Sequence, residues 1–492
     1  MRSSGILMHL TSLPGGHGIG SMGKCAYAFV DYLKSAGQRY WQILPLCPTG
    51  YGNSPYQCFS TFAGNHFLID LDLLVEEGLL TTQETEAIHW GDREDFVDFG
   101  LQHQHRTKLL YLAYERYPGS EAFETFCREN GGWLWDYALF MALKAKHGGR
   151  PWHTWEEGLK FRQPEALAAA RRELDSEVRF YCFVQFLFFR QWNSLHAYAN
   201  RQGIRIIGAV PIYVPLDSAD VWREPELFWL DENLDPVAVA GCPPDAFTAD
   251  GQLWGNPLYR WDRLKQSGYD WWVRRLHAAG TLYDVTRLDH FRGFESYWAV
   301  PFGDATAKNG RWMTGPGLDF VRTLQQRLPD LELIAEDLGY LTREVLELRE
   351  ESGWPGMKVL QFAFDSKEPS NYLPHTYEKN TVCYTGTHDN MTMRQWFDTI
   401  DDESLAFARD YMNLSDQEGY VWDTIRTAFA SVSDLCIVPM QDLLDLGVEG
   451  RMNLPGSLSD DNWTWRATQE QISPELARKL RKLTELYGRL DG

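Results

Sequence analysis

Three apolar, strand-like runs in this 492-residue chain each end close to a carboxylate. The first leads through Arg287 into Asp289, the second (331–335) into Glu336, and the third (381–386) into Asp389. Burying an aspartate among arginines is costly unless the charges pair or take part in chemistry. A carboxylate nucleophile together with a carboxylic acid is the pair that cleavage or transfer of a glycosidic bond needs.

Each carboxylate has an expected role. Asp289 is the candidate nucleophile, and Arg287, two residues earlier on the same strand face, is expected to hold it charged and aimed. Glu336 is the candidate general acid/base, with a pKa raised by neighbouring carboxylates and partial burial. Asp389 is expected to bind sugar hydroxyls, and His290 and His388 to donate further hydrogen bonds to the same ring. A retaining mechanism requires the nucleophile and the acid to lie about 5–5.5 Å apart.

A purely structural alternative competes with this interpretation. Carboxylates at strand ends often serve as caps or as salt-bridge partners, here of Arg287, Arg292 or Lys358. For a single aspartate the structural alternative is the better one. Three carboxylates at three strand ends, each beside further polar groups, favour a shared site.

The elements that position these residues follow the pattern of a parallel barrel. Eight runs are continuously apolar, as expected for strands covered on both faces, and helical segments such as 318–328, 342–351 and 392–400 fall between them. We therefore predict the α/β class and a (β/α)₈ TIM barrel, whose strands deliver catalytic groups at their C-terminal ends. The predicted strands are Gly5–Leu13, Tyr40–Leu46, Ile204–Val214, Tyr283–Asp289, Leu331–Glu336, Met357–Phe364, Thr381–Thr387 and Leu435–Gln441.

The uneven strand spacing predicts two insertions in a single catalytic barrel domain that spans residues 1–492. The segment of about 49–201, after the second strand, contains long amphipathic patterns and is predicted to be a mostly helical subdomain. The segment of about 215–280, after the third strand, is rich in Trp, Pro, Gly and Asp and is predicted to be loop-rich and to lie over the active site.

Composition narrows the class of protein and its partners. A formal net charge of −21 argues against nucleic acid and anionic membranes as main partners. The eight cysteines form no CxxC pair or Cys/His ligand spacing, so we expect thiols in a reducing compartment and no metal site. With no secretory signal and no run long enough to span a membrane, a cytoplasmic location is expected. Aromatic residues make up 14% of the chain, and a minority of them could stack on sugar rings.

Further motifs carry a resemblance to a known family. Together with the three carboxylate segments, they resemble the 4-α-glucanotransferases (amylomaltases or disproportionating enzymes) of glycoside hydrolase family 77, over essentially the whole chain. The matching segments are Ser12–Pro14, Gly18–Gly20, Trp41–Leu46, Pro48–Gln57, Pro211–Val214, Asp217–Trp222, Gly241–Asp245, Gly251–Pro257, Pro355–Asp365 and Arg451–Gly456.

The resemblance implies a retaining double displacement on α-1,4-glucans such as maltooligosaccharides, starch, glycogen and maltodextrin, without a cofactor or metal. By match to the family's motifs, Asp289 is the nucleophile, Glu336 the acid/base and Asp389 the stabiliser of the transition state. Arg287 counts with the substrate-binding residues. The other substrate contacts that the resemblance implies are Ser54, Tyr56, Asp245, Gln252, Trp254, His290, Asp337, Asp365, His388 and Asn453.

The chain departs from the family pattern at Ala209, Ala246 and Met391, and none of these is a catalytic carboxylate. Two alternatives to the transferase stay open at this point. One is an α-1,4-glucan hydrolase of α-amylase type, against which the segments 49–57 and 241–256 argue. The other is a glucan-binding protein that has lost catalysis, against which the intact carboxylates argue.

Overall fold

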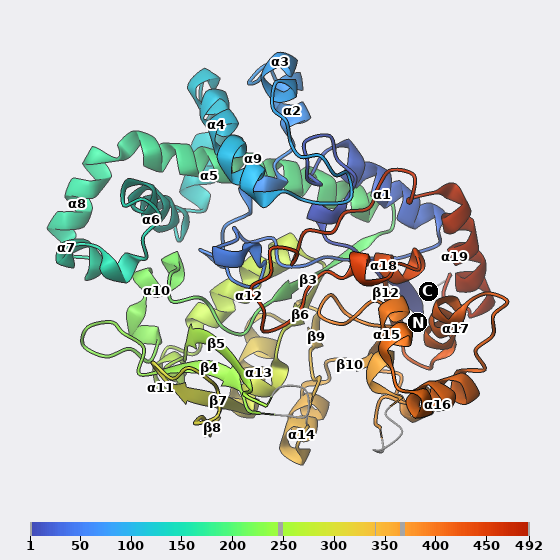
Figure 1. Cartoon of the computed structure of the whole chain (residues 1–492). Coiled ribbons are helices and arrows are strands. Elements are labelled where there is room, and N and C mark those ends of the chain that lie inside the picture. The colour runs from blue at the N-terminus through green and yellow to red at the C-terminus, as the bar shows by residue number, and fades with distance from the viewer. Residues whose placement is uncertain (1, 245–248, 340, 365–369, 491–492) are drawn as a thin grey trace.

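The protein folds around a closed barrel of parallel strands. The computed structural model describes residues 2–244, 249–339, 341–364 and 370–490. Eight strands close in the order β1-β2-β3-β6-β9-β10-β11-β12, and β12 pairs back onto β1. Figure 1 labels β3, β6, β9, β10 and β12 of this barrel. The predicted TIM barrel is therefore confirmed. Its strands are β1 (Ser3–Leu7), β2 (Tyr40–Gln42), β3 (Arg205–Val210), β6 (Val285–Leu288), β9 (Leu333–Ala335), β10 (Gly356–Val359), β11 (Thr381–Tyr384) and β12 (Leu435–Pro439).

The strands are shorter than the apolar runs that predicted them. The run Gly5–Leu13, for example, continues past β1 into a 3₁₀ turn at Leu10–Ser12, and the run Met357–Phe364 continues past β10 into a turn at Leu360–Phe362. Most residues of both turns are buried, although Thr11, Ser12 and Gln361 are polar. Hydropathy therefore predicted burial correctly but placed the strand ends too late.

Helices cover the outside of the barrel. The first and last described segments lie side by side, since the guanidinium of Arg489 donates to the carbonyl of Ser3 at 2.9 Å. Helices outside the two predicted insertions are α1 (Lys24–Ser35), α13 (Gly317–Arg327), α14 (Arg343–Ser352), α15 (Met393–Thr399), α16 (Asp402–Met412), α17 (Tyr420–Ala430), α18 (Met440–Leu443) and α19 (Pro474–Leu486).

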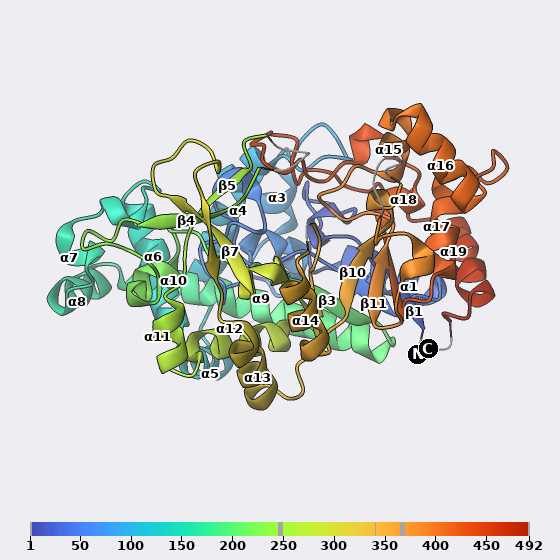
Figure 2. The ribbon, with the colours of Figure 1, turned by 90° about the horizontal axis from the view of Figure 1, so that it is seen from below.

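The segment between β2 and β3 is mostly helical. Its last helix, α9, is 27 residues long, packs on α5 and α6, and also contacts α1 and α12 beside the barrel. Figure 2 shows α6, α7 and α8 at one end of the molecule and α15 to α19 at the other, with the barrel between them. The helices are α2 (Leu71–Glu76), α3 (Thr82–Glu86), α4 (Phe99–Arg116), α5 (Glu121–Glu129), α6 (Leu134–Lys146), α7 (Glu157–Lys160), α8 (Pro164–Glu173) and α9 (Asp175–Arg201).

The segment after β3 contains regular structure that the sequence analysis did not anticipate. Strands β4 (Ala238–Cys242) and β5 (Gln252–Pro257) join β7 (Ser296–Pro301) and β8 (Arg311–Thr314) in an antiparallel sheet of order β5-β4-β7-β8. β7 lies more than 50 residues beyond its partner β4, so no local turn signal marks the pairing that joins the two halves of the sheet. Helices α10 (Ala219–Arg223), α11 (Trp261–Gln266) and α12 (Asp270–Leu282) complete this segment.

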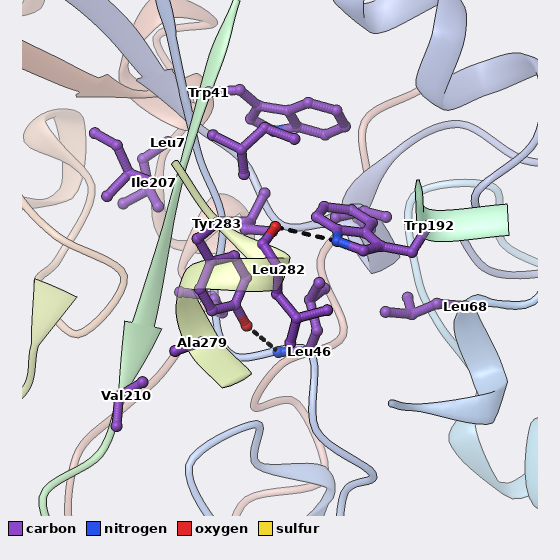
Figure 3. Packing of buried hydrophobic residues seen from close by; sticks show 14 of the residues in the cluster. Leu7, Trp41, Leu46, Leu68, Trp192, Ile207, Val210, Ala279, Leu282 and Tyr283 are labelled. Carbon is purple, nitrogen blue, oxygen red and sulfur yellow. Dashed lines mark hydrogen bonds between the residues drawn. The ribbon is translucent and has the colours of Figure 1, made fainter. Parts of the chain in front are cut away.

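Buried aromatic residues connect the barrel to its helices (Figure 3). The indole N–H of Trp192 on α9 donates to the carbonyl of Leu282 at 3.1 Å, and the hydroxyl of Tyr283 accepts from the N–H of Leu46, also at 3.1 Å. A Cβ on Gly208 would lie 2.3 Å from the Tyr283 ring, so this position of β3 requires glycine. The loop after β2 is thereby hydrogen-bonded to the short segment between α12 and β6.

Candidate active site

Asp289 and Glu336 stand just beyond the ends of two paired strands, β6 and β9. The N–H of Asp289 donates to the carbonyl of Val210, and the N–H of Glu336 donates to the carbonyl of Leu288, each at 3.0 Å. The strand ladder thus continues for one residue past each strand. Both carboxylates emerge at the C-terminal end of the barrel, where enzymes of this fold hold their catalytic groups.

A sharp turn at His290 connects the two carboxylate segments. His290 has a left-handed backbone, with φ of 51°. This conformation costs a residue with a side chain roughly 1–2 kcal/mol. It directs the N–H of His290 to Oε2 of Glu336 at 2.6 Å, and the next N–H, of Phe291, to the carbonyl of Glu336 at 2.9 Å. These bonds offset the strain and fix Glu336 relative to Asp289.

Asp289 forms the expected ion pair with Arg287. Their Oδ1 and Nη1 atoms lie 2.7 Å apart, and Arg287 is buried. The same Nη1 lies 3.5 Å from the hydroxyl of Tyr56. Burial lowers the pKa of Arg287, but the opposing effect of Asp289, Tyr56 and Glu336 is larger, and the net pKa is raised. Loss of the Asp289 charge would leave a buried cation without its partner, so the pair both aims Asp289 and requires it to be charged.

Glu336 has the electrostatic environment of a proton donor. Burial raises its pKa to about 8, and the nearby charge of Asp289 adds to this effect. Arg287 and the N–H groups of His290 and Leu338, which donate to the two carboxylate oxygens, oppose the shift without cancelling it. The expected rise in pKa is confirmed, and Glu336 is mostly protonated at neutral pH. Asp289 and Glu336 thus meet the two conditions for a nucleophile and an acid.

Asp389 follows β11 and is held from three sides. The side-chain amide of Asn453 donates to its Oδ1 at 2.7 Å, Nε2 of His388 lies 3.4 Å from its Oδ2, and Arg451 donates to its backbone carbonyl at 3.4 Å. Its side chain is about half exposed (46%), toward the barrel mouth. The structure therefore brings Asp389 and the predicted contacts His388 and Asn453 together.

Tyr56 and His388 form an aromatic wall beside Asp389. Their rings stack with centroids 5.1 Å apart and an interplanar angle of 9°. Trp463 lies against both rings, at 6.1 Å from Tyr56 and 5.9 Å from His388. Burial lowers the pKa of His388, so its imidazole is neutral near pH 7. The sequence analysis missed Trp463, because one tryptophan in a C-terminal loop cannot be told from the many that pack in the core.

Trp254 and Gln252 approach from β5 of the antiparallel sheet. The Trp254 ring meets the His290 ring edge-on at 4.8 Å, and its indole N–H donates to Gln252 at 3.1 Å. Burial, assisted by the charge of Arg292, lowers the pKa of His290 to about 3. A neutral imidazole, an indole and an amide therefore lie together at His290, whose backbone N–H donates to Glu336.

Other predicted contacts are placed differently. Ser54 accepts a hydrogen bond from the N–H of Tyr56 at 3.2 Å, which ties it to the aromatic wall. Asp337 is buried, accepts from the N–H of Met357 at 2.7 Å, and lies 3.5 Å from Arg349 on α14. Its carboxylate thus faces the helix layer, and the structure does not bring it together with the others. Two further predicted contacts, Asp245 and Asp365, lie outside the described residues.

The described residues show neither a metal cluster nor a membrane helix. Among them, no three His, Cys, Asp or Glu side chains are grouped so as to bind a metal ion. Within the same part of the chain, no helix combines the length and apolar character needed to cross a bilayer.

The fold and the site together define a class of protein. A closed parallel barrel that presents one charge-paired carboxylate and one largely protonated carboxyl at neighbouring strand ends is the framework of enzymes that cut or transfer glycosidic bonds. Residues 8–471 match the family described as 4-alpha-glucanotransferase, so the chain belongs to that family, glycoside hydrolase family 77. Members act by transglycosylation, and the hydrolase alternative is not favoured.

Individual relatives agree with this assignment along the whole chain. The 4-alpha-glucanotransferase of Clostridium butyricum is 47% identical over 488 residues, which cover 98% of this chain and 100% of that enzyme. The enzyme of Thermus thermophilus is 46% identical and covers 99% of both chains. The amylomaltase of Streptococcus agalactiae, solved in complex with acarbose, is 41% identical with a TM-score of 0.97, covering 99% of this chain and 100% of that one.

Proposed function

We propose that this chain transfers segments of α-1,4-glucans, including maltooligosaccharides, to the 4-hydroxyl of another glucan or of glucose. One observation carries the proposal at the level of chemistry. Two carboxyl groups at the ends of paired strands have different environments, since Asp289 forms an ion pair with buried Arg287, whereas burial raises the pKa of Glu336 to about 8. Such a pair can supply a nucleophile and an acid at the same pH.

The reaction runs in two displacements. In the first, Asp289 attacks the anomeric carbon while Glu336 donates its proton to the departing glycosidic oxygen, and the donor segment becomes covalently bound to Asp289. In the second, ionised Glu336 takes the proton of an acceptor 4-hydroxyl, whose oxygen attacks the anomeric carbon and releases Asp289. Two inversions retain the α configuration, and Glu336 ends protonated as it began.

Asp389 and its neighbours are proposed to hold the sugar whose bond is broken. The half-exposed carboxylate of Asp389 can accept from ring hydroxyls, and these bonds strengthen as positive charge develops at the anomeric carbon. Asn453 and His388 aim this carboxylate, and the ring of Tyr56 offers a flat surface beside it. Asp245 and Asp365 remain predicted contacts.

Transfer prevails over hydrolysis only if an acceptor sugar displaces water from the intermediate. We propose that Trp254, which lies against His290, and Gln252, which accepts a hydrogen bond from Trp254, cover such an acceptor. A further contact, between the side chains of Gln57 and Asn256 at 3.4 Å, joins the loop after β2 to the end of β5 across the mouth. We also infer a cytoplasmic location, because none of the eight cysteines, all of which lie in the described part of the chain, forms a disulfide bond.

The experiment is incubation of the purified protein with maltotriose alone, without added metal, followed by separation of products by chain length. The expected products are glucose and a ladder of maltooligosaccharides longer than maltotriose. Asp289→Asn, purified in parallel, controls for contaminating enzymes. Glucose and maltose without longer products would replace the transferase with a hydrolase, and no turnover at all would contradict both.

A further inference from the structure

A small cavity lined by polar and apolar residues lies beside His388. It is formed where β1, the loop after β11 and the end of β12 meet, and its lining includes His9, Ser12, Leu44 and Asp442. The space open to water measures about 20 Å³. A volume of this size accommodates one water molecule when two or more polar groups line it.

Two buried polar atoms of the lining lack a hydrogen-bond partner among the described residues. They are Nδ1 of His388 and the hydroxyl oxygen of Ser12. His388 is only 7% exposed and Ser12 only 1%. Buried polar atoms are nearly always paired, with protein groups or with an ordered water, because leaving them unpaired is costly. Two such atoms on one small cavity indicate a bridging molecule.

His9 supplies a donor of fixed direction to the same cavity. It is 5% exposed, and its Nδ1 accepts from the N–H of Leu44 at 3.2 Å. Burial and the proximity of His388 lower its pKa to about 3, so the ring is neutral. A neutral imidazole that accepts at Nδ1 carries its proton at Nε2. The backbone at Leu44 thereby fixes which His9 nitrogen is the donor.

We propose that His9 and Ser12 are positioning residues that hold a water in this cavity and, through it, fix the tautomer of His388. The water accepts from Nε2–H of His9, donates to Nδ1 of His388 and forms a third hydrogen bond with the Ser12 hydroxyl. With Nδ1 occupied as an acceptor, the proton of His388 must reside on Nε2.

The tautomer determines whether Nε2 of His388, the ring nitrogen that faces Asp389, carries a proton. Nε2 lies 3.4 Å from the Asp389 carboxylate, so a proton there makes the contact attractive and leaves a donor at the sugar site. In the other tautomer, the lone pair of Nε2 would face the negatively charged carboxylate, and the contact would be repulsive. The inference rests on the proposed function, in which Asp389 and His388 bind the sugar.

Two substitutions of His9 separate this role from simple packing. His9→Gln keeps a donor near the position of Nε2 but loses the acceptor for Leu44, whereas His9→Asn keeps that acceptor and loses the donor. We expect kcat for maltotriose transfer to be about tenfold lower in H9N than in H9Q, with KM equal within about twofold. If His9 only satisfied the Leu44 N–H, H9N would be the faster and more stable variant, and that order would overturn the proposal.

A crystal structure of the unliganded wild-type protein gives a readout that does not depend on turnover. The expected result is an ordered water within hydrogen-bond distance of His388 Nδ1, His9 Nε2 and the Ser12 hydroxyl, and its absence would overturn the proposal. Should neither His9 variant fold, Ser12→Ala replaces them, with kcat expected to fall about threefold at unchanged KM and Tm. An unchanged kcat in S12A would then count against the water. Failure of the wild-type protein to transfer sugar would instead reject the proposed function.

Discussion

Raising the pH is expected to stop transfer by removing the proton from Glu336. Burial and the charge of Asp289 raise the pKa of this carboxyl to about 8, and the first displacement needs its protonated form. The value of kcat/KM should therefore stay nearly level through neutral pH and fall about tenfold per pH unit above about pH 8.

The magnitude of the effect follows from the pKa. A carboxyl with the ordinary glutamate value of 4.5 is protonated in about one molecule in 300 at neutral pH, whereas one with a pKa of about 8 is protonated in about nine of ten. The environment of Glu336 therefore increases the population of the competent acid by roughly 300-fold at neutral pH. Asp289 contributes to this gain, so the nucleophile helps to keep its partner protonated.

The assay is the initial rate of glucose release from maltotriose between about pH 5 and about pH 10 at constant ionic strength, with folding checked at each pH by circular dichroism. An α-maltosyl fluoride donor is the control, because fluoride departs without a proton from the enzyme, and its first displacement should lack the alkaline limb. An alkaline limb centred near about pH 5 would refute the raised pKa. The same alkaline limb with maltotriose and with α-maltosyl fluoride would mean that a group other than Glu336 causes the loss of activity.

Three substitutions probe other contacts. Asp289→Asn should lower the rate of transfer at least about 1000-fold. It should also reduce the free energy of unfolding by about 2 kcal/mol, because buried Arg287 loses its ion pair. Activity near that of the wild type would exclude Asp289 as the nucleophile. Asn453→Ala removes the amide that donates to Asp389, so kcat should fall about tenfold, and steady-state kinetics showing only a change in KM would contradict that aiming role. Tyr283→Phe leaves the buried N–H of Leu46 unpaired, so the free energy of unfolding measured by chemical denaturation should fall by about 1–3 kcal/mol, with kcat unchanged. Stability equal to that of the wild type would mean that the loop after β2 relaxes at no cost.

The sequence predicted the barrel because parallel strands covered on both faces are continuously apolar and are separated by helical periods. The carboxylate cluster was predictable for the same reason, since parallel strands bring their C-terminal ends to one side. The ion pair of Arg287 and Asp289 followed from the two-residue repeat of side-chain direction in a strand.

Contacts between distant segments could not be predicted in this way. Trp463 reaches Tyr56 across some 400 residues, and the pairing of β4 with β7 crosses a barrel strand, so no local pattern records either contact. Asp337 shows a different limit. Its side chain points away from that of the preceding Glu336, as alternation along a strand requires, although the family resemblance had grouped it with the substrate contacts.

The pairing of β1 with β12 has a consequence for how the protein is made. Ser3 on β1 pairs with Leu435 on β12, so the barrel cannot close until β12, its last strand along the chain, has been synthesised. At synthesis rates of about 5–20 residues per second, β12 follows β1 by on the order of 20 to 90 s. Helices α4 to α9 can pack on one another during that time, whereas the edge of β1 that finally pairs with β12 lacks its neighbour and can pair with another chain. A nascent chain of this protein is therefore most exposed to aggregation late in translation, just before its last strand emerges.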